Sequence, residues 1–148
     1  MNKGLEILSA IILFGVLLFT ICFYTRIPMI IPIHYDLFNN ANGFGSKSSI
    51  WLVVVIELFT YIGMSFLQKF PQKFNYPVQV TESNKERLFF LGVRVMLVMK
   101  LCMVILYSCI LLSMVTTFSR IMNWMENVII IMVVVIPIIY IVKMNKCK

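Results

Sequence analysis

Residues Ile31–Lys47 read IPIHYDLFNNANGFGSK, a polar stretch between two long apolar runs. The stretch holds the only histidine of the chain, His34, and one of its six carboxylates, Asp36. Pro28 and Pro32 end the preceding apolar run as a helix, because proline lacks the amide donor and clashes with the preceding turn. The polar stretch therefore separates two helices.

Turn-forming residues crowd the second half of this stretch. The run Asn39–Gly43, followed by Gly45, is rich in residues that tolerate a positive φ. We therefore predict a compact loop whose tight turns bring its polar side chains close together. If any part of the chain recognises something outside a lipid bilayer, we expect it to be this loop. The residues that we single out are Pro32, His34, Tyr35, Asp36, Asn42, Gly43, Gly45 and Lys47.

Composition places the chain in a membrane. Hydrophobic residues make up 61% of the 148, which is above the share in soluble globular proteins. They come in blocks of about 20, the helix length that a hydrocarbon core of roughly 30 Å requires. The net charge of +7 is explained by membrane topology and anionic headgroups, and no basic patch interleaved with aromatics indicates nucleic acid. The bilayer is thus the first partner that we expect.

Four apolar blocks are long enough to cross a bilayer. We predict an all-α, integral membrane four-helix bundle in one domain, 1–148, with helices at about 5–24, 50–67, 88–115 and 128–142. The first block is too long for a signal peptide and lacks a small-x-small cleavage pattern, so we interpret it as a retained helix. Ser48 or Ser49 would cap the second helix. A short polar connection, 116–127, would lead to the fourth.

The basic residues predict the orientation of these four spans, because lysine and arginine accumulate in short cytoplasmic loops. One side of the predicted bundle carries eight of them: Lys3, Lys69, Lys73, Lys85, Arg87, Lys143, Lys146 and Lys148. The other side carries three: Arg26, Lys47 and Arg120. We therefore expect a multi-pass protein of the cell membrane with both termini in the cytoplasm and the His34 loop outside.

Three charges fall inside the apolar blocks: Glu57, Arg94 and Lys100. A charge at mid-helix is roughly 3 kcal/mol unfavourable, so each needs compensation. If the third helix enters the bilayer at Leu88, Lys100 lies about 18 Å inside and near the depth of Glu57, so that the two can pair. If it enters near Val95, Lys100 can snorkel to the headgroups and Arg94 is interfacial. A proton or ion pathway is a further hypothesis, although polar residues on the other helices are sparse.

Catalytic chemistry has little support in the sequence. A carboxylate such as Asp36 can orient the imidazole of His34. A hydrolase also needs a nucleophile and an oxyanion site, and one histidine with one aspartate falls short of a metal site. The four cysteines show no Cys-x-x-Cys spacing and are read as apolar packing residues. We expect no enzyme, no catalytic residue, no bound metal and no cofactor. The choice between a structural role for His34 and a ligand contact stays open.

Two motifs resemble a known family. The loop reads Pro32-Ile-His34-Tyr-Asp36 and then Asn42-Gly-Phe-Gly-Ser-Lys47, and the later connection reads Asn75-Tyr-Pro77-Val-Gln-Val-Thr81-Glu-Ser-Asn84-Lys-Glu-Arg87. Over about residues 28–100 the chain is similar to a bacterial membrane domain of unknown function, DUF1648. That domain is best known as the N-terminal part of SdpI-type toxin-immunity and signalling proteins. Asn39 stands where the family commonly has glycine, and asparagine tolerates the same backbone region.

The resemblance implies immunity to a toxic peptide and binding of a cytoplasmic regulator, as SdpI-type proteins do. Those proteins carry further transmembrane helices after this module, which the four spans found here do not include. The second motif also has a purely structural interpretation, in which Thr81 caps the third helix, with Asn84 nearby, and Pro77 fixes the approach of the chain. The alternative is a docking surface that includes Asn75 and Arg87.

We therefore expect a membrane protein whose outer loop senses, or gives immunity to, a membrane-active peptide or envelope stress. The alternative is a small transporter or an accessory subunit, in which Glu57 and Lys100 matter more than His34. An enzyme at the membrane surface would instead lose turnover when His34 or Asp36 is replaced. The partners that we consider are a secreted peptide toxin, another membrane protein, a cytoplasmic regulator and a second copy of the chain.

Overall fold

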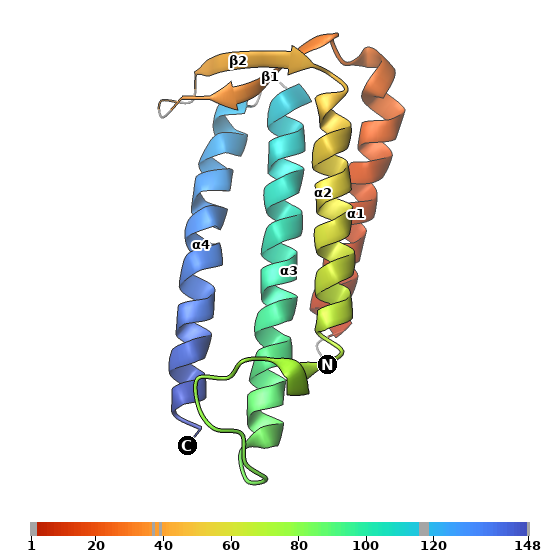
Figure 1. Cartoon of the computed structure of the whole chain (residues 1–148). Helices are drawn as coiled ribbons and strands as arrows, with labels where there is room; N and C mark the ends of the chain where they lie inside the picture. Colours follow the sequence, from red (N-terminus) through yellow and green to blue (C-terminus); the bar gives the residue numbers. More distant parts are fainter. Residues whose placement is uncertain (1–2, 37, 39, 116–118, 148) are drawn as a thin grey trace.

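Four long helices run side by side in the computed structural model, and a β-hairpin lies across one end of them (Figure 1). The structure describes residues 3–36, 38, 40–115 and 119–147, with the backbone alone at 119 and 120. The helices are α1 (Lys3–Phe23), α2 (Ser49–Leu67), α3 (Lys85–Val115) and α4 (Ser119–Asn145). All four are long and apolar enough to cross a membrane, which indicates a multi-pass membrane protein and confirms the predicted helical architecture.

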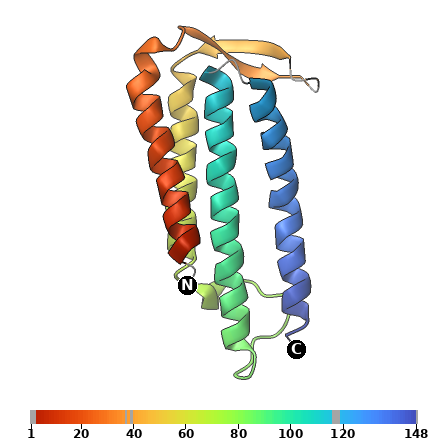
Figure 2. The same ribbon diagram turned by 180° about the vertical axis from the view of Figure 1, so that it is seen from behind.

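The two ends of the bundle differ. The hairpin covers one end, which we call the hairpin end, whereas both described chain ends and the 68–84 connection lie at the other, the termini end (Figure 2). Short 3-10 turns follow α1 (η1, Tyr24–Arg26) and α2 (η2, Pro71–Lys73). Both termini therefore lie on the same side of the bundle.

The polar stretch is not an irregular loop, so the all-α prediction is wrong there. Strand β1 (Ile30–Tyr35) pairs antiparallel with β2 (Ala41–Ser46), and register irregularities flank His34. Pro32 is accommodated because a two-stranded ribbon leaves one edge of each strand free of ladder bonds. The prediction of turns at Asn39 lies outside the described residues.

The predicted start of the fourth helix is also wrong. The fourth helix begins at Ser119, not at 128, so residues 119–127 are helical rather than a polar connection. The third begins at Lys85, which makes it 31 residues, or about 46 Å, long. Ser48 stands at the cap position of α2 without a side-chain cap bond, and its hydroxyl hydrogen-bonds that of Ser46 instead.

Helix α3 is the centre of the bundle. It packs against α1, α2 and α4, and a larger share of its residues is buried than in any of these three. Small and polar residues such as Gly92, Ser108 and Ser113 lie among its buried positions. The Ser108 hydroxyl donates to the Val104 carbonyl, which satisfies the hydroxyl within its own helix. α3 is thus the surface on which the other helices assemble.

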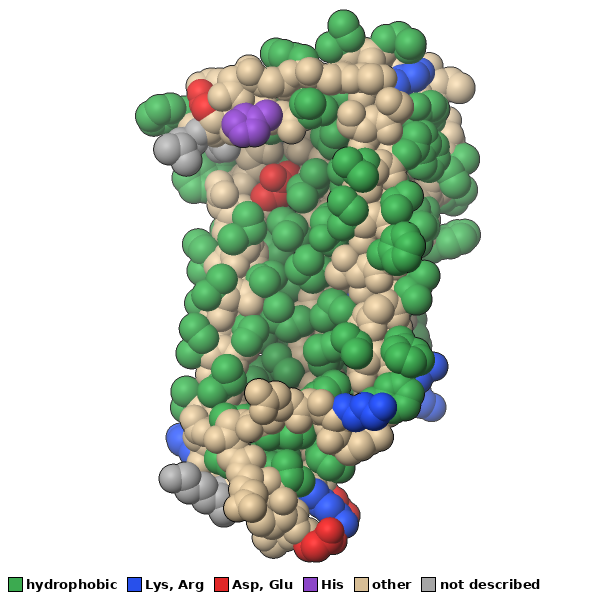
Figure 3. All heavy atoms as spheres, viewed as in Figure 1, with side chains coloured by type: hydrophobic (Ala, Val, Ile, Leu, Met, Phe, Trp, Pro, Cys, Tyr) green, Lys and Arg blue, Asp and Glu red, His purple; other side chains and the backbone are tan. Residues whose placement is uncertain are grey.

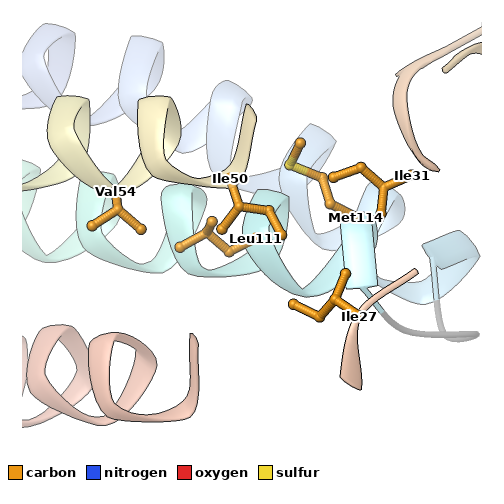
Figure 4. Close-up of a cluster of buried hydrophobic side chains, with 6 residues drawn as sticks. All are labelled: Ile27, Ile31, Ile50, Val54, Leu111 and Met114. Atoms are coloured by element: carbon orange, nitrogen blue, oxygen red, sulfur yellow. The ribbon is translucent and has the colours of Figure 1, made fainter. Parts of the chain in front are cut away.

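An apolar cluster joins the hairpin to the helices (Figure 4). Ile31 of β1 is 1% exposed and packs with side chains from α2, α3 and the segment before the hairpin. The cluster consists of Ile27, Ile31, Ile50, Val54, Leu111 and Met114. Burying this apolar surface holds the hairpin down on the bundle.

The outside of the bundle is apolar, as a lipid-facing surface requires. Hydrophobic side chains cover the middle of the face seen in Figure 3, whereas basic side chains gather toward the termini end. The exposed apolar residues include Phe14, Phe59, Ile131 and Val134, one or two from each of three helices. A hydrocarbon environment would cover all of them.

Candidate functional site

The hairpin brings two of the predicted loop residues into direct contact. His34 Nδ1 lies 2.5 Å from the side-chain oxygen of Asn42 on the opposite strand. His34 is also the register partner of Gly43. A Cβ at Gly43 would lie 2.9 Å from the Cβ of His34, closer than such atoms normally approach. The imidazole is therefore held in place by its cross-strand neighbours.

Both loop glycines serve close packing between strands, not turns as the sequence predicted. A Cβ at Gly45 would lie 2.8 Å from the Cδ1 of Ile33. Neither Gly43 nor Gly45 has a backbone angle in the left-handed region, because both lie within β2. Glycine is required because the two strands approach closely here.

Asp36 organises the tip of the hairpin. One of its carboxylate oxygens accepts hydrogen bonds from the backbone N–H groups of Phe38 (2.8 Å) and Asn40 (2.9 Å). The other accepts from the Asn40 side-chain amide at 3.2 Å. The Asn40 backbone N–H is the main cause that keeps the pKa of Asp36 below its ordinary value. Asp36 is therefore an ionised, locally bonded turn residue.

A cavity of about 680 Å³ lies beneath the hairpin. Its roof comes from β1 and the residue after it, and its walls come from α3, α4 and one residue of α2. In Figure 3 the histidine side chain, in purple, is visible at the hairpin end of the molecule. The lining residues are Ile33, His34, Tyr35, Asp36, Val53, Ile110, Ser113, Met114, Asn123, Glu126 and Asn127. The cavity thus combines polar hairpin residues with polar residues from the helices.

Polar atoms in the cavity wall lack partners. Asn123 is 4% exposed, and neither its side-chain oxygen nor its nitrogen has a hydrogen bond within the described structure. The same holds for Glu126 Oε1. Nearby, the Tyr35 hydroxyl donates to the Ser113 carbonyl at 2.8 Å and fastens the hairpin to α3. Buried polar groups are normally paired, so unpaired ones beside a cavity indicate a place for a ligand.

The sequence prediction missed the helical half of this site. Asn123, Glu126 and Asn127 were assigned to a connecting loop, whereas they lie in the first turns of α4. Their spacing of three and four residues places them on one helix face. That spacing within a run containing Ile121, Met122, Trp124 and Met125 was the available signal.

The lining of this cavity is acidic. Asp36 and Glu126 line it, and no lysine or arginine does so among the described residues. The Lys47 ammonium lies 4.8 Å from the centre of the Tyr24 ring, away from this lining, and Pro32 pairs with Phe44 in the ladder. Of the eight predicted loop residues, His34, Tyr35 and Asp36 thus reach the cavity. The lining favours a ligand that carries a positive charge.

Lys100 is 1% exposed and pairs with Glu6 of α1 rather than with Glu57. Its ammonium donates to Glu6 Oε1 at 2.7 Å and to the Ser65 hydroxyl at 3.0 Å. It also lies 4.8 Å from the centre of the Tyr61 ring. The Gln68 amide donates to the same Glu6 oxygen at 2.9 Å. The Glu57 to Lys100 pair considered from the sequence is therefore wrong, because Glu6 is the closer carboxylate.

The other two charges of the apolar blocks differ from each other. Glu57 is 1% exposed, and neither carboxylate oxygen has a hydrogen-bond partner in the described structure. Arg94 is exposed, with its guanidinium 5.9 Å from the centre of the Phe90 ring. Glu57 is therefore buried alone, whereas Arg94 lies on the outside of α3.

Asn84 holds the termini end together. Its side-chain oxygen accepts from the Thr81 N–H at 2.8 Å, and its amide donates to the carbonyls of Gln79 (3.0 Å) and Cys147 (2.9 Å). The prediction that the Thr81 side chain caps α3 is not correct in its detail. The Thr81 hydroxyl contacts Ser83, while its carbonyl accepts from the N–H groups at the start of α3. Asn84 therefore joins the connection, α3 and the end of α4.

The remaining residues of this second motif are solvent-exposed: Asn75, Pro77 and Arg87. Between them Tyr76 packs inward, donating to the Pro71 carbonyl at 2.9 Å, and burial raises its pKa to about 12. A Cβ at Gly92 would lie 2.6 Å from the Tyr76 hydroxyl oxygen. This motif is thus part of a packed connection at the termini end, far along the bundle from the cavity.

Comparison with known families agrees with the resemblance of the hairpin motif. Residues 11–58 match the family model of a domain of unknown function, DUF1648. This DUF1648 match contains the whole hairpin and Glu57, and it ends before the motif around Asn84. No curated protein and no solved structure matches the chain. The cavity residues on α3 and α4 also lie beyond the matched segment.

Proposed function

We propose that this protein binds a cationic, amphipathic peptide at its hairpin end and thereby senses it or protects the membrane from it. Binding rather than turnover is the activity. The observation that carries the proposal is the acidic cavity beneath the hairpin, whose wall holds the Asn123 side chain and Glu126 Oε1 without hydrogen-bond partners among the described residues. A positively charged side chain of the peptide would donate to Glu126 Oε1 and to the Asn123 side-chain oxygen, and bonds to charged groups are among the stronger ones.

The outer face of the hairpin complements the other half of such a peptide. Ile30 is 69% exposed and Phe44 is 63% exposed, although both lie on strands above the bundle. Met29 and Phe38 are exposed as well. Exposed apolar surface next to a charged cavity suits a ligand that is itself apolar on one side and basic on the other. Membrane-active peptides have this character.

Peptide titration tests the proposal directly. The protein in lipid nanodiscs is titrated with a synthetic helical peptide of lysine and leucine, and with the same peptide carrying glutamate in place of lysine. We expect the lysine peptide alone to bind, and Glu126→Gln to weaken it about tenfold, which equals about 1.4 kcal/mol. The control is Glu86→Gln, which removes an exposed carboxylate at the termini end. Equal binding by parent and Glu126→Gln protein would reject this site.

Protection of cells supplies a second test. We expect cells that express the protein to survive a membrane-active cationic peptide better than cells that lack it. His34→Ala should behave like the absence of the protein, because it removes the partner of Asn42 at the cavity roof. A His34→Ala protein that is made in normal amounts and protects fully would exclude a role for the hairpin in protection.

For this function the hairpin must lie outside the cell. We propose a cell-membrane location with both termini in the cytoplasm, supported by the excess of basic residues at the termini end. A reporter fused after Lys47 should register outside, and a tag at Lys148 should resist protease added to intact cells. If the hairpin is protected and the tag is cleaved, the orientation is the opposite of the one proposed. A secreted peptide could then not reach the hairpin.

A second candidate function is proton or ion transfer, which the unpartnered Glu57 favours. An ionisable group without partners inside a membrane bundle is often functional. The protein in liposomes would then dissipate a pH gradient, and Glu57→Gln would abolish that flux. The matched control is Glu82→Gln, which changes an exposed carboxylate. Absence of flux in the parent protein would leave peptide binding as the function.

A further inference from the structure

A second cavity lies at the termini end, on the outside of α3. Its volume is about 730 Å³, and the segment that follows α2, through Gln68, Lys69 and Pro71, forms its other side. The lining includes Lys69, Phe89, Phe90, Val93, Arg94 and Leu97. It therefore combines an apolar wall with two basic side chains, and it shares no residue with the cavity under the hairpin.

The two cations lie at the same depth. The hydrogen bond between Lys100 and Ser65 aligns α3 with α2, which runs in the opposite direction. Arg94 lies six residues before Lys100, or about 9 Å toward the termini end. Lys69 lies four residues after Ser65, or about 6 Å in the same direction. Both therefore lie near the level at which α1 begins and α2 ends, where the phosphates of a surrounding bilayer would lie.

Neither cation is neutralised by the protein. Among the described residues, the ion pairs are Lys85 with Glu82 and Lys100 with Glu6, so Lys69 and Arg94 have no carboxylate within ion-pair distance. The Glu6 carboxylate is already paired with Lys100, so it does not neutralise Lys69 or Arg94. Two uncompensated positive charges at one groove attract a negatively charged group.

The Arg94 guanidinium lies 5.9 Å from the centre of the Phe90 ring, about one helical turn nearer the termini end than the Arg94 backbone. From that point the apolar part of the groove continues through Val93 and Leu97 toward the middle of the bundle. Phe90, Arg94 and Leu97 follow one another at spacings of four and three residues, and Phe89, Val93 and Leu97 do so at four and four. These residues form a strip along α3 that is about 12 Å long from Phe89 to Leu97. Such a strip fits a hydrocarbon chain rather than a free ion.

We propose that this groove is a binding site for one anionic phospholipid. Lys69 and Arg94 hold its phosphate, and an acyl chain lies along Phe89, Val93 and Leu97. The guanidinium can donate two parallel hydrogen bonds to phosphate oxygens, and the ammonium supplies a second positive charge. The site depends on neither the orientation of the protein nor the proposed peptide binding.

Native mass spectrometry tests the proposal. The purified protein in detergent is titrated with phosphatidylglycerol and, separately, with phosphatidylcholine of the same acyl chains. We expect one phosphatidylglycerol to bind at least tenfold more tightly than phosphatidylcholine. The double variant Lys69→Gln, Arg94→Gln should lose this preference. The control, Lys73→Gln with Lys143→Gln, removes two cations that lie over the aromatic rings of Phe70 and Tyr140 and should retain it.

A second variant tests the apolar half. Val93→Phe fills the groove without changing charge, and we expect it to lower phosphatidylglycerol binding about tenfold while the melting temperature stays within a few degrees of the parent. Glycerol phosphate, which lacks acyl chains, should not compete. Equal binding of both lipids, an equal loss in the control double variant, or full competition by glycerol phosphate would each overturn the lipid site.

Discussion

The bundle contains two buried polar clusters that differ in how completely they are satisfied. Toward the termini end, Lys100 is 1% exposed and has a carboxylate, a hydroxyl and an aromatic ring around its ammonium. At the hairpin end, Asn123 is almost as buried and has no hydrogen-bond partner within the described structure. Both clusters lie between helices of the same bundle, so depth alone does not explain the difference.

The difference separates a structural role from a binding role. A buried group that the protein itself satisfies is already in its low-energy state, and removing a partner lowers stability. A buried group left unsatisfied beside a cavity lowers stability as it is, and a ligand can supply what is missing. The Lys100 cluster therefore holds helices together. The Asn123 cluster instead has unpaired polar atoms that a bound ligand could satisfy.

Glu6→Gln is the change for which we expect the largest effect. It removes the counter-charge of Lys100, and breaking a buried pair in this way costs about 3 kcal/mol or more. The free energy of unfolding, measured by denaturant titration in mild detergent, should fall by that amount. Glu126→Gln, in the other cluster, should change it by less than about 1 kcal/mol, because that carboxylate has an oxygen without a partner.

A double variant distinguishes the charge pair from general damage. Glu6→Gln combined with Lys100→Met removes both charges and should recover much of the lost stability. If Glu6→Gln alone is as stable as the parent, or if Glu126→Gln is the more harmful of the two, the two clusters do not differ as described.

Gly43→Ala is expected to have the next largest effect, at the cavity roof. Its methyl group would lie 2.9 Å from the Cβ of His34, so the strands must move apart, and overpacking of this kind costs about 1–3 kcal/mol. Backbone hydrogen exchange at residues 30–46 should accelerate. Gly63→Ala is the control, since nothing lies within 4 Å of a Cβ there. Unchanged exchange in Gly43→Ala would mean that the hairpin tolerates a wider separation.

Asn84→Ala tests the termini end without touching either buried cluster. It removes the acceptor of the Thr81 N–H and the donor to two carbonyls, so we expect a loss of about 1–3 kcal/mol. Limited proteolysis should cut the 68–84 connection sooner. Ser83→Ala, an exposed neighbour, should not have this effect. If cleavage is the same in both variants, Asn84 does not hold this end closed.

The smallest effect that we expect is the pH dependence of the hairpin tip. Because the folded pKa of Asp36 is below its ordinary value of 3.8, ionisation stabilises the folded tip at pH values above 3.8. That contribution is lost as the pH falls below 3.8 and through the folded pKa. The protection factor for hydrogen exchange at the Asn40 amide, which corrects for the intrinsic pH dependence of exchange, should therefore fall in acid. Asp36→Asn should abolish the dependence, and its persistence in that variant would assign it to another group.

The sequence predicted the four helices and singled out His34 and Asp36 as candidate site residues, because both have local signals. Blocks of apolar residues report helices that cross a bilayer, and His34 with Asp36 stands out in a chain of few charges. The hairpin itself was missed, since Pro32 was interpreted as a residue that ends a helix and the glycines were interpreted as turn residues. The glycines are needed because the two strands come into close contact there. That contact depends on strand pairing, which no local sequence pattern indicates.

The partners of buried charges were not predictable from depth alone. Glu6 and Lys100 are 94 positions apart, and their pairing depends on how α1 packs against α3. The cavity residues Asn123 and Glu126 looked like a loop because polar residues near a proposed boundary are ambiguous. Their spacing on one face becomes informative only once that segment is known to be helical.

The central position of α3 has a consequence for biogenesis. During synthesis α1 and α2 leave the ribosome before α3, and they gain their main packing surface only when α3 joins them. Lys100 adds a charge that makes α3 less favourable to insert alone, yet α1, which carries the Glu6 carboxylate, has been made before it arrives. We therefore expect α3 to integrate efficiently only after α1, so that translation order itself helps to assemble the bundle.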